Sequence, residues 1–319
     1  MSGLVLGTRG SALALAQTQL VRAALAAAHP DLRIEIREFT TTGDQRQDLS
    51  LSAATHGDAG EQIDKGLFTK ELEQALLAEE IHVAIHSLKD LPTANPPGLT
   101  VAAVLPRANP ADILIFKVSE ADYRTALPLR PGATIATSSA RRQRQLLHQR
   151  PDLRVVDIRG NVGTRLEKLR DRPEWSALVL AYAGLERLGF DLTNGFLEIA
   201  GAKFGVRSLG PEMILPAVGQ GAIALQAREA DAVTRSELAA INHPDTFTAV
   251  SAERELLRRL GGGCQSPVGV STVLRDGELT MRAVFHHSAD QPPRNGVARG
   301  RDPLEVAAAV ATQLLASDA

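Results

Sequence analysis

The sequence predicts two α/β domains followed by a smaller α+β domain, and three observations carry this prediction. First, 319 residues are too many for one ordinary domain, and a hydrophobic content of 44% is enough for more than one core. Second, short apolar segments alternate with helical patterns over the first two thirds of the chain. Third, the rest of the chain changes to a long helix, a hairpin and a final helix.

The two α/β units are predicted from apolar segments with strand character that are each followed by a helical pattern. The pattern restarts after Pro110, so residues 105–110 are interpreted as a crossover between the units. Strand–helix alternation is typical of mostly parallel sheets. Strands are expected at residues 4–7, 32–36, 82–86, 99–105, 112–116, 133–137, 154–158 and 177–180, and helices at 11–28, 68–79 and from Ser139.

The C-terminal unit is predicted from its helix ends and its turn. A long helix over residues 246–260 ends at three glycines, Gly261 to Gly263. Asp276-Gly277 lies between two alternating runs, as in a hairpin turn, and Asp302-Pro303 is typical of a helix start. The expected domains are 1–106 with 206–227, then 107–205, then 228–319.

Composition excludes several classes of protein. The net charge of −2 and the aromatic content of 3% disfavour a nucleic-acid-binding module, which needs a basic field and stacking platforms. The single cysteine, Cys264, allows neither an intramolecular disulfide nor a cysteine-based metal cluster, and we expect no metal site. No secretory signal is recognisable, and no apolar run approaches the roughly 20 residues that span a bilayer. A cytoplasmic protein without a membrane partner is expected.

Residues 141–170 are rich in basic side chains for a chain of this net charge. A solvated helix face explains most such runs, but position favours a binding site here. Residues 137–142 and 159–165 each follow a predicted strand and open a helix, and residues 8–11 repeat this arrangement. Such turns place N–H groups, hydroxyls and guanidinium groups where α/β sheets bind ligands. Because guanidinium groups pair with carboxylates and phosphates, the turns indicate a small polyanion in a cleft between two domains.

Two further clusters have both a structural and a functional interpretation. Residues 85–92 end an apolar strand with Ser87, Lys89 and Asp90, which is either a surface ion pair or an ionised carboxylate aimed into the cleft. Cys264 follows three glycines, so it is either a buried structural cysteine or a covalent attachment point. Gly219-Gln220-Gly221 matches part of a dinucleotide fingerprint, but it precedes a predicted strand instead of a helix, and we reject that interpretation.

Taken together, these motifs resemble the hydroxymethylbilane synthases, also called porphobilinogen deaminases. The resemblance runs from Gly7 to about Gly269 and rests on ordered motifs at residues 7–17, 65–72, 86–92, the two arginine turns, 216–221 and 260–267. It implies two domains like periplasmic anion-binding proteins and a third domain that carries the cysteine. It also implies a dipyrromethane cofactor on a thioether to Cys264, to which four porphobilinogen units are added with loss of ammonia before water releases hydroxymethylbilane.

The resemblance also assigns residues. Asp90 matches the catalytic aspartate, which assists ammonia loss, stabilises cationic pyrrole nitrogens and transfers protons. The implied cofactor-binding residues are Cys264, Lys89, Ser87, Arg141, Arg142, Thr137, Ser138 and Ser139. The implied substrate-binding residues are Arg9, Ser11, Lys65, Arg159, Arg165, Arg187 and Gln220. The family resemblance favours a monomer.

The chain departs from the family's pattern at three places. Ala111 stands where an arginine is common, Gln226-Ala227 replaces a Glu-Cys pair, and the loop between Asp48 and Lys65 is longer than usual. None of these is an assigned site residue. The alternative from another class is a non-enzymatic two-domain anion-binding protein, which would explain the arginine turns but not Asp90 or Cys264.

Overall fold

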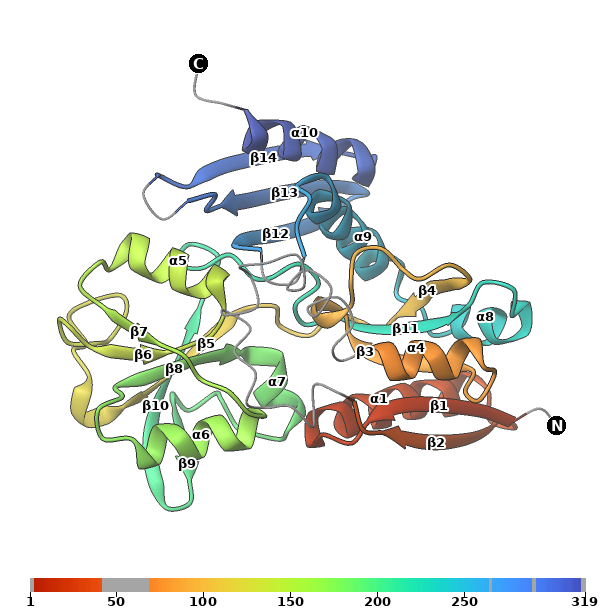
Figure 1. The fold of residues 1–319 in the computed structure, drawn as a ribbon, viewed down its shortest axis with the longest axis horizontal. Coiled ribbons are helices and arrows are strands. Elements are labelled where there is room, and N and C mark those ends of the chain that lie inside the picture. Colours follow the sequence, from red (N-terminus) through yellow and green to blue (C-terminus); the bar gives the residue numbers. More distant parts are fainter. Residues whose placement is uncertain (1–2, 42–68, 264–265, 289–290, 317–319) are drawn as a thin grey trace.

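The computed structural model describes residues 3–41, 69–263, 266–288 and 291–316. Within these ranges the elements form three sheets, and each sheet has its own helices (Figure 1). We refer to the parts built on these sheets as domains 1, 2 and 3, in chain order. In Figure 1, domain 1 lies at the lower right, domain 2 at the lower left and domain 3 above both.

Domain 1 is a five-stranded sheet of order β2-β1-β3-β11-β4. Strands β1 and β3 are largely buried and begin with mainly apolar residues, whereas β2 is a half-exposed edge strand in which isoleucines alternate with charged residues. The strands are β1 (Gly3–Arg9), β2 (Arg33–Phe39), β3 (Val83–Ser87), β4 (Leu99–Val104) and β11 (Ile223–Arg228). The helices are α1 (Ala12–Ala28), α4 (Lys70–Leu77), α8 (Ala232–Ala239) and the one-turn η1 (Leu88–Asp90).

Domain 2 is a six-stranded sheet of order β7-β6-β8-β5-β10-β9. Its core includes the apolar strands β5 and β8 and is closed on one side by Leu166 and Leu169 of α6. The strands are β5 (Asp112–Lys117), β6 (Thr134–Ala136), β7 (Arg154–Val156), β8 (Ala177–Ala181), β9 (Phe196–Ile199) and β10 (Ala202–Leu209). The helices are η2 (Val118–Glu120), α5 (Ala140–Gln149), α6 (Val162–Asp171) and α7 (Tyr182–Arg187).

Domain 3 is an antiparallel three-stranded sheet against which two helices pack. It consists of α9 (Pro244–Arg259), β12 (Val268–Arg275), β13 (Glu278–Phe285), β14 (Arg294–Gly300) and α10 (Pro303–Leu315). The predicted hairpin is confirmed: Asp276 and Gly277 have φ angles of 52° and 71°, as a two-residue turn between β12 and β13 requires. Asp302 caps α10 by accepting hydrogen bonds from the N–H groups of Leu304 and Glu305.

The predicted fold class, two α/β domains and a smaller α+β domain, is confirmed by these sheets. The expectation of mostly parallel sheets is wrong. In domain 1, β1 pairs in parallel with β2 and β3, but β11 is antiparallel to both of its neighbours. In domain 2, β5 and β10 pair only in antiparallel fashion. The reason is that the chain leaves domain 1 after β4 and returns through β11, so the returning strand enters the sheet in the opposite direction.

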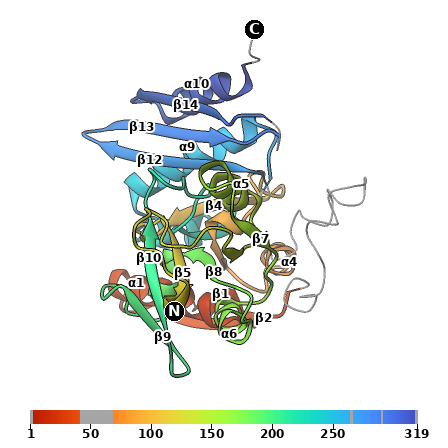
Figure 2. The same cartoon turned by 90° about the vertical axis from the view of Figure 1, so that its left-hand side faces the viewer.

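The two segments that cross between domains 1 and 2 are both held by domain 3. Arg107, on the outgoing segment, pairs with Glu253 of α9 through two hydrogen bonds of 2.6 and 3.0 Å. The same carboxylate accepts hydrogen bonds from the N–H of Gly219, on the returning segment, and from the hydroxyl of Thr272 on β12. A turn of the view by 90° shows domain 3 above domains 1 and 2, which overlap in this view (Figure 2). Among the described residues, no helix is long and apolar enough to cross a membrane.

Candidate active site

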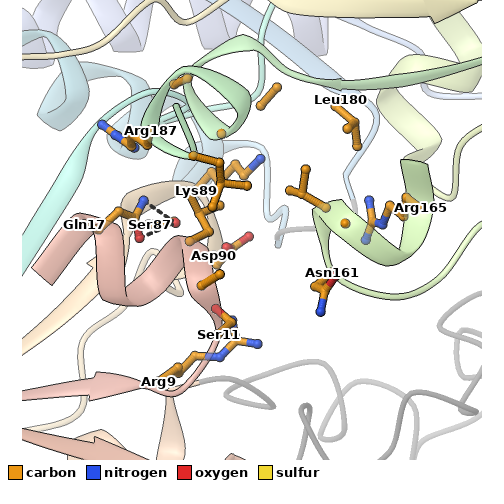
Figure 3. A pocket seen from close by; sticks show the side chains of 18 of the residues that line it. Arg9, Ser11, Gln17, Ser87, Lys89, Asp90, Asn161, Arg165, Leu180 and Arg187 are labelled. Atoms are coloured by element: carbon orange, nitrogen blue, oxygen red, sulfur yellow. Dashed lines mark hydrogen bonds between the residues drawn. The ribbon is translucent and has the colours of Figure 1, made fainter. Parts of the chain in front are cut away.

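A cavity of about 810 Å³ lies between domain 1 and domain 2. This volume is within the usual range for small-molecule sites. Six basic side chains and one carboxylate, that of Asp90, line it among the described residues (Figure 3). The basic residues are Arg9, Lys89, Arg142, Arg159, Arg165 and Arg187. Such an excess of positive charge attracts anions.

The domain 1 side of the cavity begins at the turn between β1 and α1. Ser11 is the N-cap of α1, and its hydroxyl accepts a hydrogen bond from the N–H of Ala14. The positive end of a 17-residue helix dipole therefore lies at the cavity, beside Arg9. Further along the same helix, Gln17 exchanges hydrogen bonds with the hydroxyl of Ser87, at 2.9 and 3.2 Å (Figure 3).

Asp90 and Lys89 lie on η1, the single turn that follows β3. Asp90 is exposed on the cavity side, whereas Lys89 is partly buried. Burial lowers the pKa of Lys89 to about 8, although the carboxylate of Asp90 acts in the opposite direction. The turn is fixed on both sides, because Leu88 and Leu91 are buried and the N–H of Leu88 donates to the carbonyl of Ala222.

The domain 2 side is built on the turn between β7 and α6. Asn161 is the N-cap of α6, and its side chain accepts a hydrogen bond from the N–H of Thr164. Gly160 has a φ of 111°, which favours glycine, and a Cβ atom there would lie 2.8 Å from Thr164. Arg165 donates to the carbonyl of Gly160 at 2.7 Å. Burial, with the like charges of Arg142 and Arg159, lowers the pKa of Arg165 to about 10.

Arg187 links the two walls. It lies at the end of α7 in domain 2 and donates a 2.6 Å hydrogen bond to the carbonyl of Gly221, on the segment that returns to domain 1. Burial lowers the pKa of this arginine as well. Gly221 has a φ of 87°, and a Cβ atom there would lie 2.5 Å from the carbonyl oxygen of Ala108.

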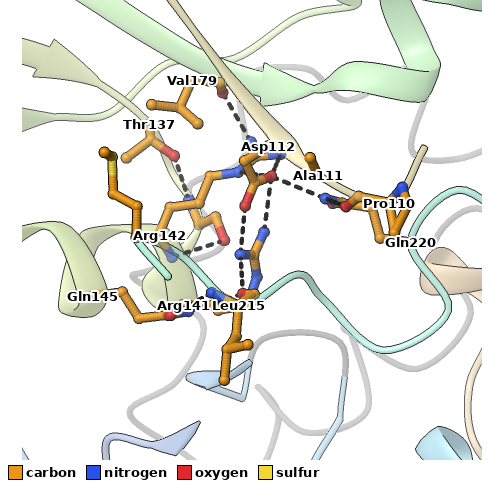
Figure 4. A network of polar contacts seen from close by, with 12 residues as sticks. Pro110, Ala111, Asp112, Thr137, Arg141, Arg142, Gln145, Val179, Leu215 and Gln220 are labelled. Atoms are coloured by element: carbon orange, nitrogen blue, oxygen red, sulfur yellow. Dashed lines mark hydrogen bonds and ion pairs between the residues drawn. The ribbon is translucent and has the colours of Figure 1, made fainter. Parts of the chain in front are cut away.

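Arg141 and Arg142 belong to a buried network around Asp112 (Figure 4). Both guanidinium groups bond to the Asp112 carboxylate, at distances from 2.6 to 3.2 Å. Asp112 is fully buried, and the two arginines are 4% and 6% exposed. Burial alone would raise the pKa of Asp112, but the two arginines outweigh it and hold the pKa far below its usual range. Gln220 donates to the same carboxylate at 3.0 Å.

A second, smaller cavity of about 50 Å³ lies where the three domains meet. Gly263 and Ser266, the described residues on either side of Cys264 and Gln265, line it. So do Lys89, Arg141 and Arg254, together with Ser139, the N-cap of α5. In the described part of the chain, Nε of Arg141 is buried without a hydrogen-bond partner. This cavity is therefore lined by cationic and hydroxyl groups that can donate hydrogen bonds to an anion.

Several predicted site residues have local structural contacts. The hydroxyl of Ser138 joins the ends of β6 and β7, because it bonds to both the N–H and the carbonyl of Ile158. The Thr137 hydroxyl accepts from the N–H of Ser139, and Gln220 is 1% exposed and does not line the large cavity. Cys264 and Lys65 lie outside the described residues. The other predicted residues line one of the two cavities.

The sequence interpretation missed three residues of this region. Asp112, Gln17 and Arg254 each make several of the contacts that position the predicted site. A signal existed for Asp112, because this acidic residue directly precedes the four apolar residues of strand β5. Gln17 and Arg254 lie on helices that carry other polar residues, so the sequence does not distinguish them.

Comparison with known proteins assigns the family. Residues 4–236 match the family described as "Porphobilinogen deaminase, dipyromethane cofactor binding domain", and residues 247–316 match "Porphobilinogen deaminase, C-terminal domain". The porphobilinogen deaminase of Roseiflexus sp. is 42% identical over 98% of this chain and 95% of its own. That of Desulforudis audaxviator is 48% identical over 88% of this chain and 83% of its own.

Similar solved structures are more distant. The periplasmic VFT2 domain of Bordetella pertussis BvgS is 14% identical, with a TM-score of 0.42 over 78% of this chain and 92% of its own. The methionine-binding protein MetQ is 11% identical, with a TM-score of 0.42 over 79% of this chain and 94% of its own. The matches to the two sequence families together cover most of the chain. The chain belongs to the porphobilinogen deaminase family.

Proposed function

We propose that this chain condenses four porphobilinogen molecules, one after another, onto a dipyrromethane cofactor held by a thioether to Cys264, and that Asp90 is the catalytic acid and base. Each addition forms a carbon–carbon bond and releases ammonia, and water finally releases linear hydroxymethylbilane. The observation that carries the proposal is the cavity in which one carboxylate, Asp90, faces six basic side chains among the described residues. The family assignment makes the activity that of a transferase in tetrapyrrole biosynthesis.

The basic residues suit the charge of the substrate. Each porphobilinogen carries an acetate and a propionate, so a growing chain gains two negative charges with every addition. We propose that Arg9, Arg159, Arg165 and Arg187 bind these carboxylates, since guanidinium groups pair with them bidentately. The N-termini of α1 and α6 face the same cavity and favour anions further. We infer the same role for Ser11 and Lys65.

Asp90 is suited to proton transfer by its position. Its carboxylate is exposed to the cavity. Lys89 directly precedes Asp90 in the sequence, and the charges of the two side chains interact. We propose that Asp90 gives a proton to the departing amine, stabilises positive charge on a pyrrole nitrogen and takes up the proton that the attacked ring carbon loses. The basic residues hold the carboxylates of the reactants so that the two carbons meet in the right orientation.

The smaller cavity offers hydrogen-bond donors for the carboxylates of a dipyrromethane. When bound, this group supplies a pyrrole ring carbon that can be extended. The cavity is lined by Lys89, Ser139 and Arg141, which can donate hydrogen bonds to these carboxylates. We propose that Lys89, Arg141 and Ser139 hold these carboxylates, with Arg142, Ser87, Thr137 and Ser138 supporting the site. The contact proposed for Gln220 with substrate has less support, because its amide group is buried against Asp112 and Pro110.

The family assignment and Asp90 together argue against a non-enzymatic anion-binding protein. Such a protein would need the basic cavity but no carboxylate at its centre. We further propose that the enzyme is a monomer and acts in the cytoplasm, as the resemblance implies. Sedimentation of the purified protein and fractionation of cells test these two points, and a stable dimer or a membrane-bound fraction would contradict them.

Intact mass measurement of the purified protein, before and after mixing with porphobilinogen, tests the reaction. We expect a covalent excess of two pyrrole units that grows in single-pyrrole steps. A mass that substrate never changes, in protein shown to be able to load cofactor, would refute the proposal. Asp90→Ala should carry the excess of two pyrrole units but should not form product. If Asp90→Ala turns over normally, the catalytic assignment is wrong.

A further inference from the structure

Arg254 of α9 binds the segment that immediately follows Asp90. Its Nη1 donates to the carbonyl of Leu91 at 3.2 Å, and its Nη2 donates to the carbonyls of Pro92 and Thr93 at 2.8 and 3.1 Å. One guanidinium group thus contacts three consecutive carbonyls. Arg254 belongs to domain 3, whereas Asp90 belongs to domain 1, so these bonds cross a domain boundary.

Apolar packing strengthens this contact. Val250, one helical turn before Arg254 on α9, is in the same buried cluster as Leu88 and Leu91, the residues on either side of Lys89 and Asp90. The turn of Asp90 is therefore packed against α9 by its leucines and bonded to α9 through the carbonyls that follow. The proline at position 92 has no N–H to donate, so its own backbone can form hydrogen bonds only through its carbonyl.

The same helix leads to the cofactor position. α9 ends at Arg259, and Gly261 to Gly263 connect it to Cys264. Arg254 and Gly263 also line the same small cavity. A single rigid element therefore contacts the segment of the proposed catalytic carboxylate and continues into the loop that carries the cysteine.

We propose that Arg254 is a positioning residue, which fixes Asp90 relative to the cofactor by holding the carbonyls of residues 91–93. This inference rests on the catalytic role proposed for Asp90. Arg254 acts through the backbone of the Asp90 segment and is not itself needed to hold the cofactor. A misplacement of about 1 Å can reduce a rate about 100-fold, so removal of the guanidinium group is expected to lower kcat about 10- to 100-fold with little change in KM.

Arg254→Met in the full-length enzyme tests the proposal, with Arg258→Met as the matched control. Arg258 lies one turn further along α9, is exposed and donates to Glu255, so its loss removes a charge from the same helix without touching the Asp90 segment. We expect Arg254→Met to carry the mass of two pyrrole units and to show the fall in kcat. Arg258→Met should behave like the wild type. Arg254→Lys, which keeps a cation that can donate to the carbonyls, should recover part of kcat.

Introducing Arg254→Met into the Asp90→Glu variant distinguishes a positioning role from a general loss of structure. In Asp90→Glu the carboxylate is already displaced, so adding Arg254→Met should cost much less than it does in the wild type. Equal losses in both backgrounds would overturn the proposal, as would a normal kcat in loaded Arg254→Met. Failure of both Arg254→Met and Arg254→Lys to load cofactor would also overturn it, in favour of a direct contact with cofactor. Normal turnover by Asp90→Ala would instead refute the function proposed for Asp90.

Discussion

Replacing Glu253 with alanine is expected to loosen all three domains at once. The Glu253 side chain is fully buried and Arg107 is 13% exposed, and their ion pair has bonds of 2.6 and 3.0 Å. Glu253 also accepts hydrogen bonds from Thr272 and from the N–H of Gly219 at 2.7 Å. Its carboxylate therefore ties both crossover segments to α9 and β12.

The expected loss follows from what the substitution leaves behind. Removing one partner of a buried ion pair costs about 3–5 kcal/mol, because the other charge stays buried without compensation. The N–H of Gly219 also loses its acceptor, and a buried donor without a partner costs about 1–3 kcal/mol. These terms overlap, so we expect Glu253→Ala to lower stability by at least about 3 kcal/mol. At about 2–4 °C for each kcal/mol, the first thermal transition should fall by about 6 °C or more.

Thermal unfolding followed by circular dichroism measures this loss, and Glu255→Ala is the control. Glu255 lies two residues further along α9 and pairs with Arg258 and Arg259, both exposed. Exposed pairs of this kind contribute about 0–1 kcal/mol. If Glu253→Ala and Glu255→Ala unfold at the same temperature, Glu253 does not hold the domains together as reasoned here.

Three further predictions concern the site. Burial lowers the pKa of the Lys89 ammonium to about 8 in the ligand-free protein, and the cofactor carboxylate proposed to lie beside it would raise this pKa. In the loaded enzyme kcat/KM should therefore fall only above that value, as Lys89 loses its charge; Lys89→Arg, whose guanidinium keeps its charge to higher pH, should lack this fall, and identical pH profiles would contradict the assignment. Cys264→Ser should show no covalent excess of two pyrrole units in its intact mass, and a fully loaded variant would disprove the anchor. Asp112→Asn leaves two buried arginines without a carboxylate, so its thermal midpoint should fall by about as much as that of Glu253→Ala, and an unchanged midpoint would show that the pairs add no stability.

Local features of this fold could be predicted because their causes are local. Ser139 caps α5 and Asp302 caps α10, as residues that precede a helical pattern commonly do. The turn at Asp276-Gly277 follows from backbone angles that glycine and aspartate tolerate. The direction of β11 could not be predicted, because it depends on the path of the chain through another domain. The strand pattern over residues 223–228 does not indicate which way the strand runs in its sheet.

The arginines of the site show where sequence reasoning stops. Arg141 and Arg142 lie in the same basic run as Arg165, and no local pattern separates them. The structure separates them by their partners, since the first two bond to Asp112, which lies about 30 residues away in the sequence. Ion-pair partners distant in sequence are set by the packing of the domains. The basic run therefore predicted a cluster of cations at a cleft, but not that Arg141 and Arg142 also bond to a buried carboxylate.

The different surroundings of these arginines have an energetic consequence for Arg165. The charge of Arg142 is compensated by Asp112 in the same network. The pKa of Arg165 is lowered first by burial and then by the like charges of Arg142 and Arg159. A bound carboxylate would attract these cations and so offset their repulsion. It would also replace the water that the guanidinium group of Arg165 loses by burial. The protein meets that cost in advance, through folding, so the cavity needs little rearrangement when an anion enters. Repulsion among the cavity's basic residues thus destabilises the ligand-free protein, and its relief by a bound anion favours binding.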